Sequence, residues 1–552
     1  MPQLSGSNRN QLQLLSLETL ISADNPVRVL DAYVSSLDLP SLGFEEKGQQ
    51  EDGRPAYGCS VLLKLYLYGY HNRIRSSRGL ATECERNIEL WWLLEELRPK
   101  YKTIADFRKL HSSALKSLFV AFSKFCLGLD LYGGERIAVD GSKFGGQNSK
   151  KNNYSSKKLD QHLSYLSEKA DSYLAQLNAL DEQESEAESA LEAAESRSKI
   201  EQKLAQVQER EEKYEGLKEE LKASCEKQVS TTDPDARLLA TSGQGGTVGY
   251  NVQSSVDSKH CMVAHFEVSN QTDHHALTRM CKESKEILEV EEIDALADQG
   301  YHTGVELQAC AEAGIRTFVA PKSRVSAKGL YDKDAFVYQR EEDQYICPNG
   351  QALSSSGTWR VKNAKELVKP YRVKTYKLPS QICMECPLKT QCLTEKMIQN
   401  KKAKLIERAE YETALENNQR RVKQNRDYYK QRQAMVEHPF GTIKRQWGYT
   451  HSLMKTISKV EADFALIFLT YNLKRAISIL GVKQLIEKIK EGQKQDPFKY
   501  QAIRPLIAFA KARYEGRKVT KQSLSRWTCT LKSIQIKPQR TIFEDLRGFC
   551  TL

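Results

Sequence analysis

Three acidic residues stand where their carboxylates could serve one metal site. Asp140 lies near the middle of IAVDGSKF, in which Ile137 and Val139 alternate with Ala138 and Asp140 as residues do in a strand. Asp298 ends a second apolar run, IDALADQGY. Glu437 lies in QAMVEHPFGTIKRQWGY, a segment with helical spacing on both sides of the acid. Two strand-end aspartates and one helical glutamate therefore emerge as candidate ligands, although they are far apart in the chain.

Carboxylates in such a set suit hard divalent cations. Mg²⁺ and Mn²⁺ bind carboxylate oxygens and keep positions open for phosphate and water. Two such ions about 4 Å apart can clamp the attacking and the leaving oxygen of a phosphodiester. A single aspartate after a strand is more commonly a turn cap. Only the convergence of all three acids would indicate phosphodiester chemistry.

Four of the 13 cysteines form a second group of candidate ligands: Cys347, Cys383, Cys386 and Cys392. Only one pair among them has the close spacing of a zinc knuckle. Four thiolates would suit tetrahedral Zn²⁺. The close pair is Cys383 and Cys386, and the step to Cys392 is looser. Structural zinc, ordinary reduced thiols and a redox role all stay open.

Basic residues offer contacts to a nucleic-acid backbone. The turn NRIRSSRG carries Arg73, Arg75 and Arg78 between helical stretches, which suits DNA binding or a helical bundle with solvated arginines. Lys444 lies seven residues after Glu437, so the two share a face if the helix is continuous, and the ammonium could hold phosphate. The alternative is a solvated charge pair.

Charge and composition bound the class of protein. The chain of 552 residues has a net charge of +12, and residues 481–552 hold 16 Lys/Arg against 6 Asp/Glu. Such a surplus suits nucleic acid as a partner, or a basic protein with no such partner. We expect no membrane span and no signal peptide, a soluble cytoplasmic protein and reduced thiols.

The elements that must position these residues alternate in type along the chain. Residues 1–130 have helical spacing, and Thr103 is the expected N-cap of one helix. Within residues 155–228, a heptad seam from Leu159 to Leu180 predicts a long helix or an antiparallel helical hairpin. We expect an RNase H-like core to start in residues 131–322, with the Cys-bearing insertion at 323–400, completing helices at 401–480 and a basic tail at 481–552.

The order of the core elements predicts this fold, an α+β or α/β arrangement. A strand, the helical insertion, a hairpin and then alternating helices and strands match three antiparallel strands followed by parallel ones. In that layout the ends of the first and fourth strands lie side by side. Asp140 and Asp298 would then be neighbours, and a later helix would bring in Glu437. Pro439 would kink that helix or begin a new one.

With these residues in view, the chain resembles the DDE transposases of bacterial insertion sequences. VDGSKF, GYNVQSSVD, ADQGY and VEHPFGTIKR are similar to blocks of that family, in the branch with a helical N-terminal domain and a cysteine-bearing insertion. The resemblance covers about residues 20–480. It implies that three acids form a metal-binding triad: Asp140, Asp298 and Glu437. It also implies DNA contacts from Lys444, Tyr429 and Arg432. Arg432 lies one residue farther from the glutamate than is usual in the family.

The resemblance also implies an activity. The protein would bind the terminal repeats of its element and use two Mg²⁺ ions, or Mn²⁺, for DNA cleavage and strand transfer without a covalent intermediate. It would act on the bacterial nucleoid as a homo-oligomer, at least a dimer on DNA. Two alternatives remain: a nuclease of the same fold that cuts without joining, and a DNA-binding protein that has lost catalysis.

Overall fold

The computed structural model describes residues 10, 14–45, 55–183, 190–224, 226–241, 245–321, 329–362 and 370–495. The chain divides into two compact units. Unit 1 comprises Met1–Phe122 and Glu461–Leu552, and unit 2 comprises Ser123–Val460. The basic tail predicted for 481–552 is described as far as residue 495, and its remainder lies outside the described residues.

Unit 1 is helical, as predicted for the N-terminal region. Its boundaries with unit 2 fall within α7 and α17. Thr103 lies inside α6, whose N-cap is Lys100, so the predicted N-cap is wrong. The helices of the unit are α1 (Leu17–Leu20), α2 (Val27–Ser35), α3 (Cys59–His71), α4 (Ser77–Arg86), α5 (Ile88–Leu93), α6 (Tyr101–Leu110), α7 (Ser112–Gly128), α17 (Ile457–Leu480) and α18 (Val482–Gln495).

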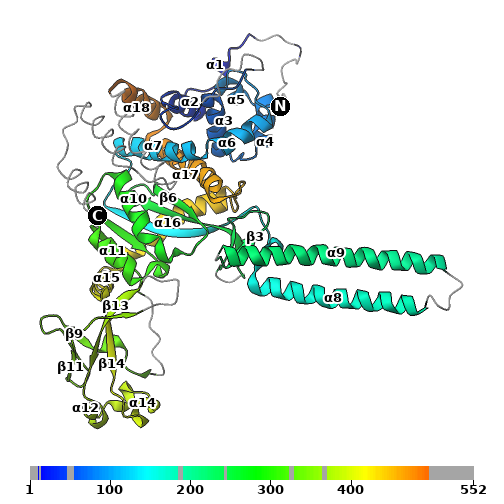
Figure 1. Ribbon diagram of the computed structural model, residues 1–552. Coiled ribbons are helices and arrows are strands. Elements are labelled where there is room, and N and C mark those ends of the chain that lie inside the picture. The colour runs from blue at the N-terminus through cyan, green and yellow to red at the C-terminus, as the bar shows by residue number, and fades with distance from the viewer. Residues whose placement is uncertain are drawn as a thin grey trace, which may run out of the picture. The chain divides into compact units, whose positions relative to one another are not determined.

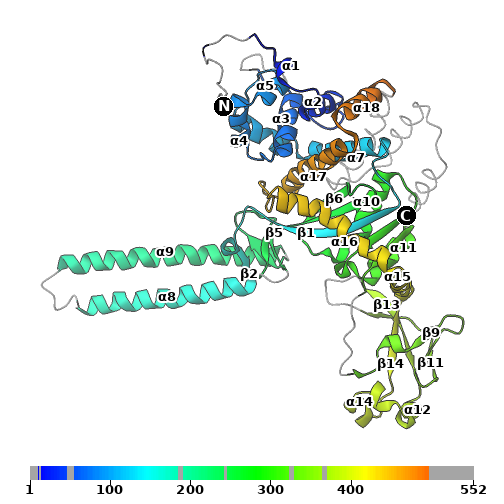
Figure 2. The same ribbon diagram turned by 180° about the vertical axis from the view of Figure 1, so that it is seen from behind.

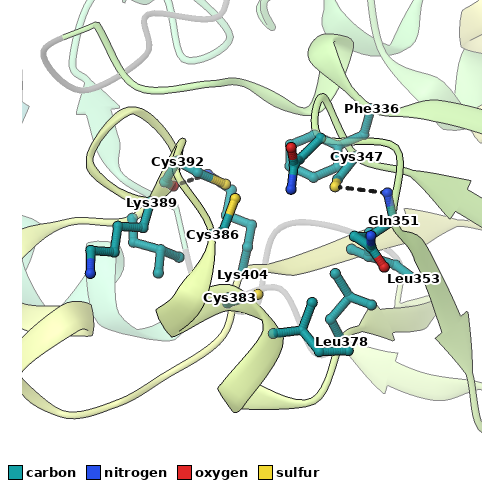
Figure 3. Close-up of a pocket in the computed structure, with 13 residues that line it drawn as sticks. Phe336, Cys347, Gln351, Leu353, Leu378, Cys383, Cys386, Lys389, Cys392 and Lys404 are labelled. Atoms are coloured by element: carbon teal, nitrogen blue, oxygen red, sulfur yellow. Dashed lines mark hydrogen bonds between the residues drawn. The ribbon is translucent and has the colours of Figure 1, made fainter.

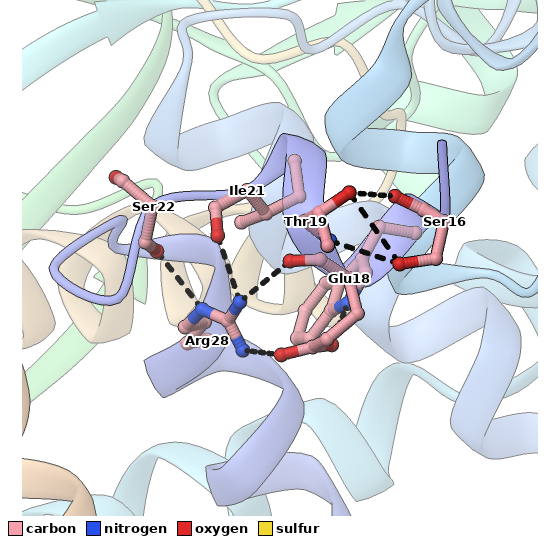
Figure 4. A network of polar contacts seen from close by, with 7 residues as sticks. Ser16, Glu18, Thr19, Ile21, Ser22 and Arg28 are labelled. Carbon is pink, nitrogen blue, oxygen red and sulfur yellow. Dashed lines mark hydrogen bonds and ion pairs between the residues drawn. The ribbon is translucent and has the colours of Figure 1, made fainter. Parts of the chain in front are cut away.

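A polar network fixes the short first helix of unit 1 (Figure 4). Arg28 of α2 donates from Nη1 to Glu18 Oε1 at 2.6 Å and from Nη2 to Ile21 O at 2.8 Å. Its Nε donates to Ser22 O at 2.9 Å. Helix α1 has only four residues and buries none of them. The single guanidinium therefore ties the start of the unit to α2, because a helix this short is not stable alone.

Helices α17 and α18 together are the one candidate for a membrane span among the described residues. No single helix in the described part of the chain is long and apolar enough to cross a membrane. Helix α17 together with Val482–Gly492 of α18 has the required length and composition, but the pair is bent by 109°. Every residue of α17 from 460 to 473 is buried.

Unit 2 contains a mixed sheet that carries two of the candidate acids (Figure 1). Its order is β4–β5–β1–β7–β8, and β6 also pairs with β5. β5, β6 and β1 are joined by antiparallel pairing, whereas β1, β7 and β8 are parallel, as the element order predicted. The bounds are β1 (Arg136–Gly145), β4 (Arg237–Leu239), β5 (Thr247–Asp257), β6 (Val263–Ser269), β7 (Ile293–Ala297) and β8 (Ile315–Val319).

Helices pack on this sheet. α16 contacts β1, β5 and β7, and α15 contacts β8. Figure 2 shows α16 beside β1. The helices are α10 (Leu277–Leu288), α11 (Gly304–Glu312), α15 (Glu412–Gln424) and α16 (Arg426–Gly441). α16 continues through Pro439 and runs into a π-helical turn, Thr442–Gln446. The proline therefore neither begins a new helix nor ends this one, and the change in helix type follows it.

Two long helices fill the region of the predicted heptad seam. α8 (Ser156–Gln183) and α9 (Ala190–Ala223) run side by side in both views (Figures 1 and 2). Short strands β2 (Asn153–Ser155) and β3 (Gln228–Ser230) pair where the two helices begin and end. Leu159 and Leu221 pack with Tyr154 in a small buried cluster there. The hairpin alternative of the sequence prediction is thus the one observed.

A second sheet occupies the cysteine-bearing region. Its order is β12–β13–β11–β10–β9, with β14 paired to β13. The prediction of helix from Lys401 onwards is wrong at β14, because Ala409 pairs with Val373 of β13. The elements are β9 (Val337–Gln339), β10 (Gln344–Ile346), β11 (Ala352–Ser355), β12 (Arg360–Lys362), β13 (Tyr371–Lys377), α12 (Ser380–Glu385), α13 (Lys389–Cys392), α14 (Glu395–Gln399) and β14 (Leu405–Ala409).

Candidate active site

The two strand-end aspartates come together at one edge of the main sheet. In the parallel pairing of β1 and β7, Val139 lies opposite Ala297. Asp140 and Asp298 are the next residues on these two strands, so they are neighbours, as predicted. Asp298 is also the N-cap of a short 3₁₀ helix and accepts the N–H of Gly300 at 2.8 Å.

The Asp140 carboxyl is half-buried and has charged groups of both signs near it. Burial raises its pKa to about 6 from an ordinary 3.8, and the carboxylates of Asp298 and Asp273 act in the same direction. Arg432 and the N–H of Gly141 lower this pKa. The direction follows from the cost of ionising an acid with little water and like charges nearby. A cation bound at this position would remove that cost.

Asp273 is a further acid at this place, and the sequence prediction missed it. Its Oδ1 accepts from Asn251 Nδ2 at 2.8 Å and from Gln253 Nε2 at 2.5 Å. Its Oδ2 lies 3.5 Å from Lys143 Nζ. A Cβ built on Gly141 would approach Asp273 Oδ1 to 2.5 Å. The glycine after Asp140 therefore makes room for this carboxylate. Gly141 signals a close approach to the backbone, but nothing in the sequence identifies Asp273 as the group that approaches.

Helix α16 covers the face of the sheet to which the two aspartates belong. Met435 and Val436 pack in one buried cluster with Ala138 and Leu296 (the cluster also contains Phe318). Because side chains alternate along a strand, the residues two positions on from Ala138 and Leu296 leave the sheet on the same face. Those residues are the two aspartates. The predicted approach of this helix to the sheet is therefore observed.

Residues of α16 and of the turn after it contact the two strands that carry the aspartates. Tyr429 donates its hydroxyl to Ala297 O at 3.3 Å, next to Asp298. Lys444 Nζ donates to Lys143 O at 2.6 Å and lies 4.2 Å from the Phe144 ring centroid. Burial and the charge of Lys143 lower the pKa of Lys444 to about 8, against the opposing effect of Asp140.

Glu437 lies on the exposed side of α16. It follows Val436 directly, and its Oε1 accepts from Gln433 Nε2 at 2.8 Å. In the described residues no group of three or more His, Cys, Asp or Glu side chains is arranged so that it could hold a metal ion. The structure thus brings together Asp140 and Asp298 with Asp273, and it places Glu437 on the helix that covers them without gathering it into a ligand set.

The predicted arginine contacts separate into surface and interior residues. Arg73 and Arg78 are exposed, and the Arg78 guanidinium lies 5.5 Å from the Tyr101 ring centroid. Arg75 is buried, and its Nη2 lies 2.6 Å from Asp463 Oδ2 of α17. The structure therefore places Arg75 in the interior of unit 1 and not on a surface that DNA could contact.

The four cysteines of the insertion, which are separated by up to 45 positions, line one small cavity of about 30 Å³ (Figure 3). All four are free thiols: Cys347, Cys383, Cys386 and Cys392. They are half-buried.

Two models of known protein families match parts of the chain. A family model described as Transposase DDE domain matches residues 346–477, and one described as Transposase domain (DUF772) matches residues 15–110. The chain therefore carries a transposase DDE domain and an N-terminal transposase domain. No curated protein and no solved structure matched the chain.

The two matches cover different candidate residues. The DDE match includes Glu437, Lys444 and the cysteine cavity, and the N-terminal match includes Arg73 and Arg78. Asp140 and Asp298 lie outside both ranges. DDE transposases are polynucleotidyl transferases, so the transposase is an enzyme that acts on DNA.

Proposed function

We propose that this transposase binds the ends of its own mobile element and catalyses DNA cleavage and strand transfer in an RNase H-like core. The strand order β6–β5–β1–β7–β8 supports that core, because three antiparallel strands are followed by two parallel ones. The catalytic residues in this proposal are Asp140, Asp298 and Glu437. The observation that carries it is the register of β1 and β7, which makes the two aspartates neighbours beneath α16.

The residues at the sheet edge fit divalent cations. The donor set consists of oxygen ligands, which Mg²⁺ and Mn²⁺ prefer over softer metals. The raised pKa of Asp140 supports a cation at this place, because a nearby positive charge would stabilise the ionised carboxyl. Asp140, Asp298 and Glu437 would hold the ions, which when bound neutralise charge on the phosphodiester and activate the attacking oxygen. Glu437 would join them by turning its exposed side chain toward the sheet edge.

Neighbouring residues orient the DNA and the acids. Lys444 and Arg432 place positive charge beside Asp140, where they can hold the phosphates on either side of the cut. Asp273 accepts hydrogen bonds from Gln253 and Asn251, which fixes these three side chains next to Gly141. Tyr429 fixes α16 to the end of β7.

The proposed reaction has two displacements at phosphorus. Water attacks the phosphodiester at the element's end, the P–O3′ bond breaks and the element keeps a free 3′-hydroxyl. That hydroxyl then attacks a phosphodiester of target DNA, and a target 3′-hydroxyl leaves. No Ser or His nucleophile is needed, since the acids and bases at the sheet edge position the reactants. Two ends must be held together, so we propose at least a dimer on DNA.

DNA recognition is assigned to the helical N-terminal region, residues 1–130. Arg73 and Arg78 are exposed there and can contact phosphates. Arg75 is left out, because Asp463 holds it in the interior. Phosphate contacts of this kind make affinity depend on salt concentration.

The experiment uses purified transposase, Mg²⁺ and DNA that carries the flanking terminal repeats, with the cut and the joined product mapped on sequencing gels. Asp140→Asn should abolish cleavage and joining and leave end binding largely intact. Glu291→Gln changes an exposed acid of unit 2 and serves as the matched control. Cleavage without any joined product would indicate a nuclease, and full activity of Asp140→Asn would end the assignment.

A further inference from the structure

The cysteine cavity has no part in the proposed reaction, and its thiols come from three separate segments. Cys347 lies in the turn after β10, Cys383 lies in α12, and Cys386 is the C-cap of that helix. Cys392 ends α13. All four line the same cavity, and the close-up shows Cys383, Cys386 and Cys392 on one side and Cys347 on the other (Figure 3).

The rest of the lining favours thiols as the only ligands. No carboxylate and no imidazole is among the described residues that line the cavity. The two lysines at its rim are engaged with backbone carbonyls. Lys404 Nζ donates to Cys392 O at 3.2 Å and to Tyr331 O at 3.0 Å, and Lys389 Nζ donates to Met384 O at 3.1 Å. A set of four thiol ligands favours zinc and other thiophilic metals over Mg²⁺ or Ca²⁺.

The turn at Cys347 is already built to support a thiolate. The Cys347 N–H donates to Gln351 O at 2.9 Å, and the Gly350 N–H donates to Cys347 O at 2.8 Å. The Gln351 N–H lies 3.4 Å from Cys347 Sγ, to which it donates (Figure 3). Backbone N–H groups aimed at a sulfur stabilise its negative charge, as they do around bound metal. Gly350 has a φ of +74°, which a residue with a side chain would adopt only under strain.

We propose that the four thiols bind one Zn²⁺ ion, which ties α12 and α13 to the turn between β10 and β11. The thiols are not at ligand spacing in the described structure. Rotation about χ1 moves each sulfur without moving the backbone, and a cavity of about 30 Å³ lies between them. The benefit is structural. The sheet of β9–β14 has short strands and a small core, and small units of this kind commonly need a metal or a disulfide for stability.

The test measures metal directly on the full-length protein. Transposase purified from zinc-supplemented cells should contain about one Zn²⁺ per chain by mass spectrometry of the metal. Cys383→Ser and Cys392→Ser should each lower that content severalfold. Cys261→Ser, which changes a half-buried thiol in the turn between β5 and β6, should leave it unchanged.

Two measurements on the unmutated protein keep the test decisive if a variant fails to fold. Replacing zinc by Co²⁺ should give the sulfur-to-cobalt charge-transfer bands of a tetrahedral thiolate site. Four thiols should react with a thiol reagent only after a chelator is added. Absence of metal and of the cobalt bands, or a disulfide among the four cysteines, would overturn the proposal. DNA cleavage is not used as a readout, so this result is independent of the proposed function.

Discussion

Replacing Asp140 by Asn should stabilise the metal-free transposase at neutral pH while abolishing its activity. The folded protein raises the pKa of this carboxyl from 3.8 to about 6. A rise of one unit in the pKa corresponds to about 1.4 kcal/mol. Ionised Asp140 therefore lowers the unfolding free energy of unit 2 by at most about 3 kcal/mol. Water that reaches the half-buried side chain reduces this value. An amide has no charge to desolvate and avoids the cost.

The sign of the pH dependence follows from the direction of the pKa change. Below about pH 4 the carboxyl is protonated in both the folded and the unfolded state, so wild type and variant should be equally stable. As the pH rises from about 4 to about 6, the unfolded chain ionises first and wild-type stability falls. Above about pH 6 the difference should stay constant.

The assay is calorimetry of both proteins with a chelator present, over this pH range. For the 338 residues of unit 2, 3 kcal/mol corresponds to a melting temperature about 4 °C higher in the variant at neutral pH. Mg²⁺ should then raise the melting temperature of the wild type and not of Asp140→Asn. A variant that melts at or below the wild-type temperature at neutral pH would refute the reasoning.

Three further predictions concern Lys444, Gly141 and Arg75. Lys444→Ala should weaken the binding of element ends on the order of tenfold, as measured by fluorescence anisotropy. The affinity of the wild type should fall as the pH rises through about 8, because this lysine then loses its charge. Lys444→Arg should show no such fall. Gly141→Ala should destabilise unit 2 by about 1–3 kcal/mol and impair cleavage, because its Cβ would meet Asp273 Oδ1 at 2.5 Å. Arg75→Ala should destabilise unit 1 by about 1.5–3 kcal/mol in chemical denaturation, since Asp463 loses this partner and keeps Arg108 and Tyr70.

Each of these has a matched control. Gly128→Ala places a Cβ where nothing lies within 4 Å, so it should be neutral. Arg73→Ala should lower DNA affinity and leave stability unchanged, the reverse of the result at Arg75. The respective predictions would be contradicted by unchanged pH dependence in Lys444→Arg, by a neutral Gly141→Ala, or by a stable Arg75→Ala that binds DNA less well.

Local patterns in the sequence were sufficient for the core strands and for the two strand-end acids. Alternation marked β1 and an apolar run marked β7. The order of elements implied that these strands are adjacent, which fixes Asp140 beside Asp298. The heptad seam likewise predicted α8 and α9. These features depend on neighbours within a few residues, or on rules of chain connection that leave few topologies.

Long-range partners decided what could not be predicted. Arg75 has the sequence context of a surface turn, but Asp463, which holds it in the interior, lies 388 positions away. Strand β14 follows a basic stretch without clear alternation and forms because β13 is there to pair with it. Asp273 has the local appearance of a turn residue, and only the fold brings it over Gly141.

The central claim is that Glu437 joins the two strand-end aspartates as a metal ligand, and a change of ligand tests it most directly. Cys replaces each acid in turn: Asp140→Cys, Asp298→Cys and Glu437→Cys. Thiolates bind Mn²⁺ better than they bind Mg²⁺. Cleavage of a labelled element end should be absent with Mg²⁺ in all three variants and restored in part by Mn²⁺. Glu437→Cys that cleaves normally with Mg²⁺, or that Mn²⁺ fails to restore while it restores both aspartate variants, would contradict the claim.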